Sequence, residues 1–246
     1  MIEVGRSEDL GRFTYEKPLA QAAPTTVVPL GQTDVLTVEM RVVQSGTPSV
    51  FEADPTTECV WFVVGGRARF YDGVDALVGE FGESEGVAVP RSIAYRFEAV
   101  GDADLQVLHI AAVDPRLGAE VQSERTAMQP VIYESPEFDE GSDIQVPRVW
   151  VGDDMLAVTV EKVRDGGGDD RPHAHFGIVG AWFLLSGRVR FHGASDDEAF
   201  EMTTHDAVFL PSGTAYGFRA LDHEPAEFLH VKALDLGTEK HVRVDY

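Results

Sequence analysis

The chain has 246 residues, of which 43% are hydrophobic, and a formal net charge of −22. This length suits one large or two small domains, and the composition is that of a globular chain. The acidic excess repels phosphate backbones and anionic lipid, so we expect neither nucleic acid nor a membrane as a partner. The first residues lack the apolar segment of a signal peptide, and the single cysteine, Cys59, excludes an internal disulfide. We therefore expect a cytoplasmic protein.

The predicted elements are strands. Alternating β-branched residues predict a strand at 33–43, and CVWFVVGGRARF at 59–70 predicts two strands joined at a glycine turn. The same two patterns return at 154–163 and at 180–191, the latter with the sequence GAWFLLSGRVRF. Turn residues follow at short, even spacing, and no stretch has sustained helical periodicity. Many short strands with this spacing predict an all-β sandwich or barrel.

An internal repeat organises the sequence. Six residues of the first block recur 121 positions later: Trp61, Phe62, Gly66, Arg67, Arg69 and Phe70 become Trp182, Phe183, Gly187, Arg188, Arg190 and Phe191. Residues 86–97 match 207–218, and LHI at 108–110 matches LHV at 229–231, at the same offset. One offset across three separate blocks predicts a tandem duplication of one fold. We expect an N-terminal domain over residues 1–115 and a C-terminal domain over 116–246.

Each copy resembles a cupin, so the whole chain resembles a bicupin. In the second copy, His173, His175 and Gly187 match the first cupin motif, G-x5-H-x-H-x3-4-E-x6-G, and Pro211 and Gly213 match the second motif. The resemblance implies an all-β fold of two tandem jelly-roll β-barrels. It also implies chemistry on a small molecule, often with a bound metal, although this fold alone does not name a reaction.

Both copies depart from the ligand pattern of the family. In the second copy, Gly180 stands at the Glu position and Tyr216 at the position of the second-motif His. The four corresponding positions of the first copy hold Glu52, Asp54, Cys59 and Tyr95. We therefore expect no metal in the first barrel. In the second barrel the partial motif implies a divalent transition metal, which would be iron, nickel, manganese or zinc.

His173 and His175 are the candidate metal ligands. Residues two apart on a strand point from the same face, so both imidazoles can chelate one ion. A working site needs at least a third ligand, for which Tyr216 and His230 are candidates and His205 is less favoured. In the alternative interpretation, the two histidines form hydrogen bonds to substrate or water.

Tyr216 and His230 are also the candidate catalytic residues, because a phenol and an imidazole can transfer protons. Trp182 and Phe218, which repeat Trp61 and Phe97, are the candidate substrate-binding residues. An aromatic wall suits a flat or apolar small molecule, and it suits a packed core equally well.

Three functions remain open. The first is a metal-dependent bicupin enzyme with oxygenase, isomerase or lyase chemistry in the second barrel. The second is a metal-independent isomerase, epimerase or cyclase, with His173 or His175 as base and Tyr216 as acid. The third is a non-catalytic protein that binds a small molecule. In the enzymatic interpretations the first copy supports the second, which does the chemistry. A monomer and a homodimer are both compatible with the sequence.

Overall fold

The structure is a computed structural model that describes residues 11–16, 23–47, 52–54, 56–113, 126–133, 135, 137–152, 155–194, 199–234 and 240–243. The chain divides into two compact units. We call Glu16–Tyr133 the first barrel, and Met1–Tyr15 together with Glu134–Tyr246 the second barrel. No helix occurs among the described residues, so none there is long and apolar enough to cross a membrane.

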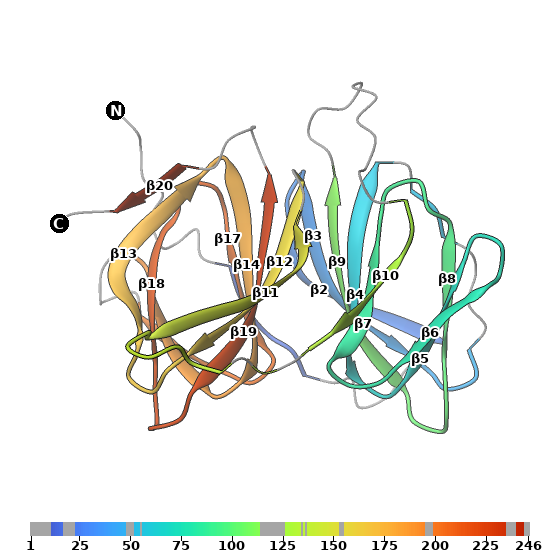
Figure 1. Ribbon diagram of the computed structural model, residues 1–246, viewed down its shortest axis with the longest axis horizontal. Coiled ribbons are helices and arrows are strands. Elements are labelled where there is room, and N and C mark those ends of the chain that lie inside the picture. Colours follow the sequence, from blue (N-terminus) through green and yellow to red (C-terminus); the bar gives the residue numbers. More distant parts are fainter. Residues whose placement is uncertain are drawn as a thin grey trace. The chain divides into compact units, whose positions relative to one another are not determined.

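The first barrel consists of two antiparallel sheets (Figure 1). The spatial order of the larger sheet is β10 (Gln129–Ile132), β7 (Glu85–Val89), β4 (Thr57–Gly65), β9 (Leu105–Val113), β3 (Leu36–Val43) and β2 (Thr25–Gln32). The smaller sheet is β6 (Leu77–Phe81), β5 (Ala68–Asp72) and β8 (Tyr95–Ala99). The strands predicted at 33–43 and 59–70 are confirmed as β3 and as the pair β4 and β5.

The second barrel has the same design (Figure 1). The spatial order of its larger sheet is β1 (Gly11–Thr14), β17 (Asp206–Leu210), β14 (Ile178–Ser186), β19 (Ala226–Leu234), β12 (Leu156–Val163) and β11 (Ile144–Gly152). The smaller sheet is β16 (Phe200–Thr203), β15 (Arg188–His192), β18 (Ala215–Ala220), β13 (Gly168–Phe176) and β20 (Lys240–Arg243). The strands predicted at 154–163 and 180–191 are confirmed. The fold is therefore all-β, with two jelly-roll barrels in tandem.

One outer strand of each large sheet lies just before the other barrel in the sequence. Strand β1 of the second barrel precedes the first barrel, and strand β10 of the first barrel precedes the main part of the second barrel. Strand β1 pairs with β17, so that Arg12 lies opposite Val208. Strand β10 pairs with β7, so that Pro130 lies opposite Val87. Because Val87 and Val208 are one repeat apart, β1 and β10 occupy equivalent places in the two sheets.

Aromatic residues fill the inside of each barrel. Trp61 and Trp182 lie in the two main core clusters, so each lies on the inward face of its strand. The indole of Trp61 lies 4.7 Å from the ring of Phe97, and that of Trp182 lies 5.0 Å from Phe218 and 5.3 Å from Phe228, between ring centroids. Aromatic packing at these distances stabilises each core beyond the burial of its surface.

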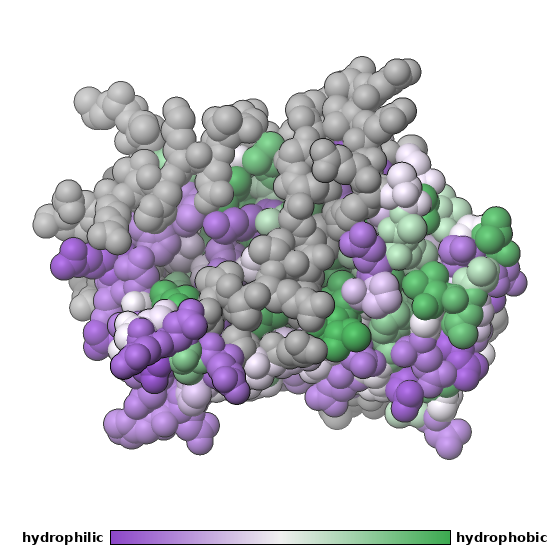
Figure 2. All heavy atoms as spheres, viewed as in Figure 1, coloured by the Kyte–Doolittle hydropathy of each residue, from purple (hydrophilic) through white to green (hydrophobic). Residues whose placement is uncertain are grey.

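The described surface agrees with the acidic composition. Figure 2 shows hydrophilic residues along the lower part of the face in view, with hydrophobic residues in smaller areas between them. The exposed large hydrophobic side chains among the described residues are Val27, Val74, Leu77 and Ile132. All four belong to the first barrel.

The two barrels differ at the position where β7 or β17 passes the backbone beside the core tryptophan. A Cβ atom added at Gly86 would lie 1.9 Å from the backbone oxygen of Trp61, whereas the repeat of Gly86 is Ala207. We expect Gly86→Ala to lower the free energy of unfolding by about 3 kcal/mol or more, because backbone must move. Ala207→Gly should cost only about 1–2 kcal/mol. Urea unfolding measures both, and equal small losses would contradict the described register.

Candidate functional site

Each barrel contains a histidine stacked on its core indole. Antiparallel pairing of β4 with β9 places Trp61 opposite His109, and pairing of β14 with β19 places Trp182 opposite His230. The ring centroids are 4.0 Å apart in the first barrel and 3.8 Å apart in the second, and the interplanar angles are 19° and 17°. Both histidines are buried. They therefore point to the inside of the barrels.

A glutamate holds each of these histidines. Nδ1 of His109 lies 3.1 Å from Oε1 of Glu39, which stands directly opposite it on β3. Nδ1 of His230 lies 2.6 Å from Oε1 of Glu161 on β12. The residue directly opposite His230 is Thr159, so Glu161 reaches the imidazole from the diagonal position. Each barrel thus contains a carboxylate–imidazole pair, but the glutamate stands at a different strand position in each.

The charges of the first pair are set by the contacts. The hydrogen bond from His109 lowers the pKa of Glu39, burial opposes this, and Arg41 lowers it again, to about 2. Burial lowers the pKa of His109, and the hydrogen bond to Glu39 opposes this only in part. At neutral pH Glu39 is therefore ionised and His109 neutral. Nδ1 of His109 lies 3.1 Å from Oε1 of Glu39 and 3.4 Å from Nη2 of Arg41, and we assign the ring proton to Nδ1 because the shorter contact is to the carboxylate. In this tautomer Nδ1–H donates a hydrogen bond to Glu39, and Nε2 carries the free electron pair.

The second pair is more deeply buried. Burial alone raises the pKa of Glu161, but the charge of His230 and the hydrogen bond to it, with Lys232 and His175 nearby, bring the pKa below its usual range. An ionised, buried carboxylate needs such partners to offset its loss of hydration. His230 is accordingly fixed by Glu161 on one side and Trp182 on the other.

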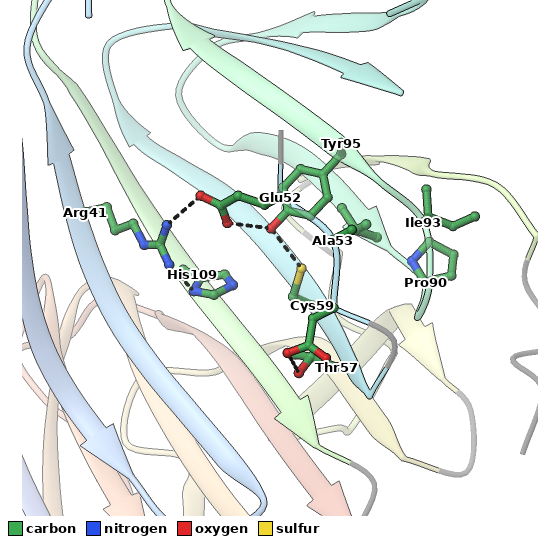
Figure 3. A pocket seen from close by; sticks show the side chains of 11 residues that line it. Arg41, Glu52, Ala53, Thr57, Cys59, Pro90, Ile93, Tyr95 and His109 are labelled. Atoms are coloured by element: carbon green, nitrogen blue, oxygen red, sulfur yellow. Dashed lines mark hydrogen bonds and ion pairs between the residues drawn. The ribbon is translucent and has the colours of Figure 1, made fainter. Parts of the chain in front are cut away.

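The first barrel opens into a cavity of about 470 Å³ beside His109. Its lining residues are Arg41, Glu52, Ala53, Asp54, Thr57, Cys59, Val89, Pro90, Ile93, Tyr95 and His109. Nε of Arg41 donates to Glu39 at 2.7 Å, and Nη1 donates to Glu52 at 3.3 Å. Figure 3 shows the Arg41 guanidinium between Glu52 and one nitrogen of His109, with the other ring nitrogen pointing away from Arg41. The cavity lies within the size range of small-molecule sites.

Tyr95 and Cys59 form the polar inner wall of this cavity. The phenol oxygen of Tyr95 accepts a hydrogen bond from Nε1 of Trp61 at 3.1 Å and donates one to Glu52 at 3.2 Å. Sγ of Cys59 lies 3.8 Å from the same oxygen (Figure 3). Burial raises the pKa of Tyr95 far above its ordinary value and that of Cys59 to about 12. Both groups therefore remain protonated and act as hydrogen-bond donors.

The second barrel brings the predicted metal and catalytic residues together. His173 and His175 lie on β13 with ring centroids 5.3 Å apart, and the ring of Tyr216 lies 4.3 Å from that of His173. His175, Tyr216 and His230 share the lining of a small space of about 10 Å³, enough for a single water molecule. The space that these described residues enclose is thus almost filled, whereas the cavity beside His109 is open.

The donor set of the second barrel is incomplete for a metal ion. Within the described part of the chain, no three His, Cys, Asp or Glu side chains are grouped so that they could hold one. Two imidazoles alone make a weak site. Tyrosine is not among these four residue types, so Tyr216, whose ring lies beside that of His173, is a further candidate ligand. The assignment of His173 and His175 as ligands stays a prediction.

Trp182 and Phe218 are both buried in the core cluster of the second barrel. Their ring centroids lie 5.0 Å apart, and neither residue lines the space beside His175. Their role as substrate contacts, and that of Tyr216 and His230 in catalysis, stays a prediction.

The open cavity lies in the barrel that the sequence analysis expected to act as a support. Its key residues, Glu39, Arg41 and His109, were not singled out as candidates. A signal was present in TVEMRV, where Glu39 and Arg41 alternate with the buried Val38 and Met40. Two charged residues on one face of an otherwise apolar strand are typical of a polar barrel interior.

Comparison with known proteins supports the fold. Residues 159–232 match the model of the Cupin domain family. No curated protein sequence matches the chain. Among solved structures, a cupin 2 conserved barrel domain protein from Leptotrichia buccalis has a TM-score of 0.70 and 13% identity, over 94% of this chain and 98% of that one.

Two solved enzymes are also similar in fold. A mutant of oxalate decarboxylase from Bacillus subtilis has a TM-score of 0.63 and 13% identity, over 95% of this chain and 79% of that one. Salicylate 1,2-dioxygenase from Pseudaminobacter salicylatoxidans has a TM-score of 0.63 and 9% identity, over 84% of this chain and 76% of that one. Identities this low establish the shared fold and not a shared reaction.

The Glu39–His109 contact makes stability depend on pH. The pKa of Glu39 in the folded protein is about 2, below its ordinary value of 4.5. Its stabilising effect is therefore complete above about pH 4.5 and is lost as the pH falls toward 2. We expect Glu39→Gln to be less stable than the wild type at pH 7, with a gap that closes between pH 4.5 and 2. Urea unfolding across this range measures the gap, with Glu83→Gln as the control, and a gap independent of pH would refute the assignment.

Proposed function

We propose that the chain, which matches the Cupin domain family over residues 159–232 and has the fold of solved cupin proteins, is a small-molecule enzyme that works by proton transfer in the cavity of the first barrel. This is the metal-independent function considered from the sequence, assigned now to His109 and Tyr95. The observation that carries the proposal is the neutral imidazole of His109, held by the ionised Glu39 at the wall of a cavity large enough for a substrate.

The contacts give each residue a distinct role. Nε2 of His109 accepts a proton from the bound substrate, and the imidazolium that forms is stabilised by Glu39 at Nδ1. The Tyr95 hydroxyl, which donates to Glu52 in the free protein, keeps its proton and turns to donate its hydrogen bond to a substrate oxygen as negative charge develops there. His109 then returns the proton to a neighbouring atom of the substrate. The net reaction is an isomerisation, which needs no oxidant.

Proton transfer can be detected before the substrate is identified. When the protein is incubated with mixtures of small metabolites in deuterium oxide, we expect deuterium to enter the substrate, as measured by mass spectrometry. His109→Gln should lower the exchange rate about 100-fold or more, because the base is lost. His230→Gln changes the equivalent residue of the second barrel and should leave the rate close to that of the wild type.

Two results of this experiment would contradict the proposal. One is exchange that survives in His109→Gln, which would place the base elsewhere. The other is exchange that is lost in His230→Gln and kept in His109→Gln, which would assign the chemistry to the second barrel.

A second candidate function is a metal-dependent reaction in the second barrel, as the family resemblance suggested. The observation that favours it is the closeness of His173, His175 and Tyr216. Imidazole is a good ligand for iron, nickel and zinc, and a poorer one for manganese. A phenolate from Tyr216 would complete a set of three ligands and leave open positions for a substrate. This candidate depends on Tyr216, because His173 and His175 have no further grouped His, Cys, Asp or Glu ligand within the described residues.

Metal content separates the two candidates. From the incomplete donor set we expect protein purified without an affinity tag to hold well below one equivalent of metal, as measured by plasma mass spectrometry. Deuterium exchange should also survive treatment with a chelator. Near-stoichiometric metal that disappears in a His173→Ala/His175→Ala double variant would support the metal-dependent function instead.

A further inference from the structure

We propose that the cavity of the first barrel binds a small organic amine, whose ammonium group pairs with Glu52. This inference rests on the proposed function and deepens it by naming the class of its ligand. It starts from the cavity and from the polar groups that line it, Glu52, Asp54, Arg41, Tyr95 and His109.

The formal charge around the cavity is negative. Arg41 supplies one positive charge, whereas Glu52, Asp54 and the adjoining Glu39 supply three negative charges, which leaves −2. His109 adds no charge at neutral pH. A cleft lined by an excess of one sign attracts ligands of the opposite sign, and the net charge of −22 on the whole chain acts in the same direction.

Arg41 is already neutralised and so does not make this an anion site. Its Nε contacts Glu39 at 2.7 Å and its Nη1 contacts Glu52 at 3.3 Å. The guanidinium also lies over the indole of Trp61, 4.7 Å from the ring centroid. A carboxylate ligand would have to replace one of these partners while two acidic groups remained nearby. Arg41 instead holds Glu39 and Glu52 in place.

The two carboxylates at the cavity wall, Glu52 and Asp54, occupy the positions of the histidine pair of the second barrel. In the first barrel the backbone of Glu52 forms a β-bridge with that of Tyr95. In the second barrel His173 pairs with Tyr216 in the same way. Asp54, two residues on, is fixed by a hydrogen bond from the backbone of Thr56. The stretch of backbone that carries two imidazoles in the second barrel therefore carries two carboxylates in the first.

The shape of the cavity indicates that the amine carries an apolar part. Val89, Pro90 and Ile93 form one wall, and Figure 3 shows Pro90 and Ile93 on the side of Tyr95 away from Arg41. The Glu52 side chain is 42% exposed, so it can receive an ammonium group directly from solvent. An organic amine satisfies the acidic and the apolar walls together, which a hydrated metal ion does not.

Three probes of similar size test this inference on the wild-type protein: benzylamine, benzyl alcohol and benzoate. Calorimetry or ligand-observed NMR should give the tightest binding for benzylamine. Glu52→Gln should weaken benzylamine about tenfold and leave benzyl alcohol unchanged, because the substitution removes the charge and keeps the shape. The matched control Glu83→Gln removes one charge outside the cavity and should leave all three affinities unchanged.

A second measurement uses only the wild-type protein. Benzylamine should shift the indole N–H resonance of Trp61, which contacts Tyr95, and leave that of Trp182 in place. Tighter binding of benzoate than of benzylamine, or a shift at Trp182 alone, would overturn the inference. Amine binding without deuterium exchange would support this inference and overturn proton transfer. Exchange restricted to substrates without an amine would support proton transfer and overturn this inference.

Discussion

The stacking of an imidazole on a buried indole is the contact on which both barrels depend. The pairs Trp61–His109 and Trp182–His230 join two neighbouring strands of each large sheet at the centre of the core. The stacking fixes the plane of the imidazole ring. The glutamate that contacts Nδ1 fixes the orientation of the ring within that plane and favours a proton on Nδ1. Only Nε2 is then left to act. A polar group thus lies inside an apolar barrel with one nitrogen hydrogen-bonded, which offsets the cost of burying the imidazole.

The barrels use this shared framework in opposite ways. In the first, the hydroxyl of Tyr95 contacts Trp61 and Cys59, and the remaining space is an open polar cavity. In the second, Tyr216 stacks parallel to Phe191 at 5.5 Å and contacts His173, and little space is left. The same tyrosine position therefore borders an open space in one barrel and fills the other.

The sequence predicted the strands, the repeat and the two barrels, because β-branched alternation and turn spacing are local patterns that recur at one offset. It also predicted that His173, His175 and Tyr216 belong together. It missed the cavity, because emptiness depends on how side chains from several strands pack and no local pattern records it. The glutamates that hold the histidines were missed for a related reason. Glu39 and Glu161 are not equivalent in register, so the repeat that revealed the tryptophans could not align them.

The places of β1 and β10 in the sequence affect how the sheets can form during synthesis of the chain. Strand β1 is synthesised before the whole first barrel, yet Gly11 pairs with Phe209, which is synthesised almost 200 residues later. The large sheet of the first barrel likewise gains β10 only when residues 129–132 have emerged. Until then β7 is an unpaired edge of the first sheet, and such an edge invites wrong pairing with other chains. A nascent chain interrupted after the first barrel would therefore carry a strand whose partner had not been translated.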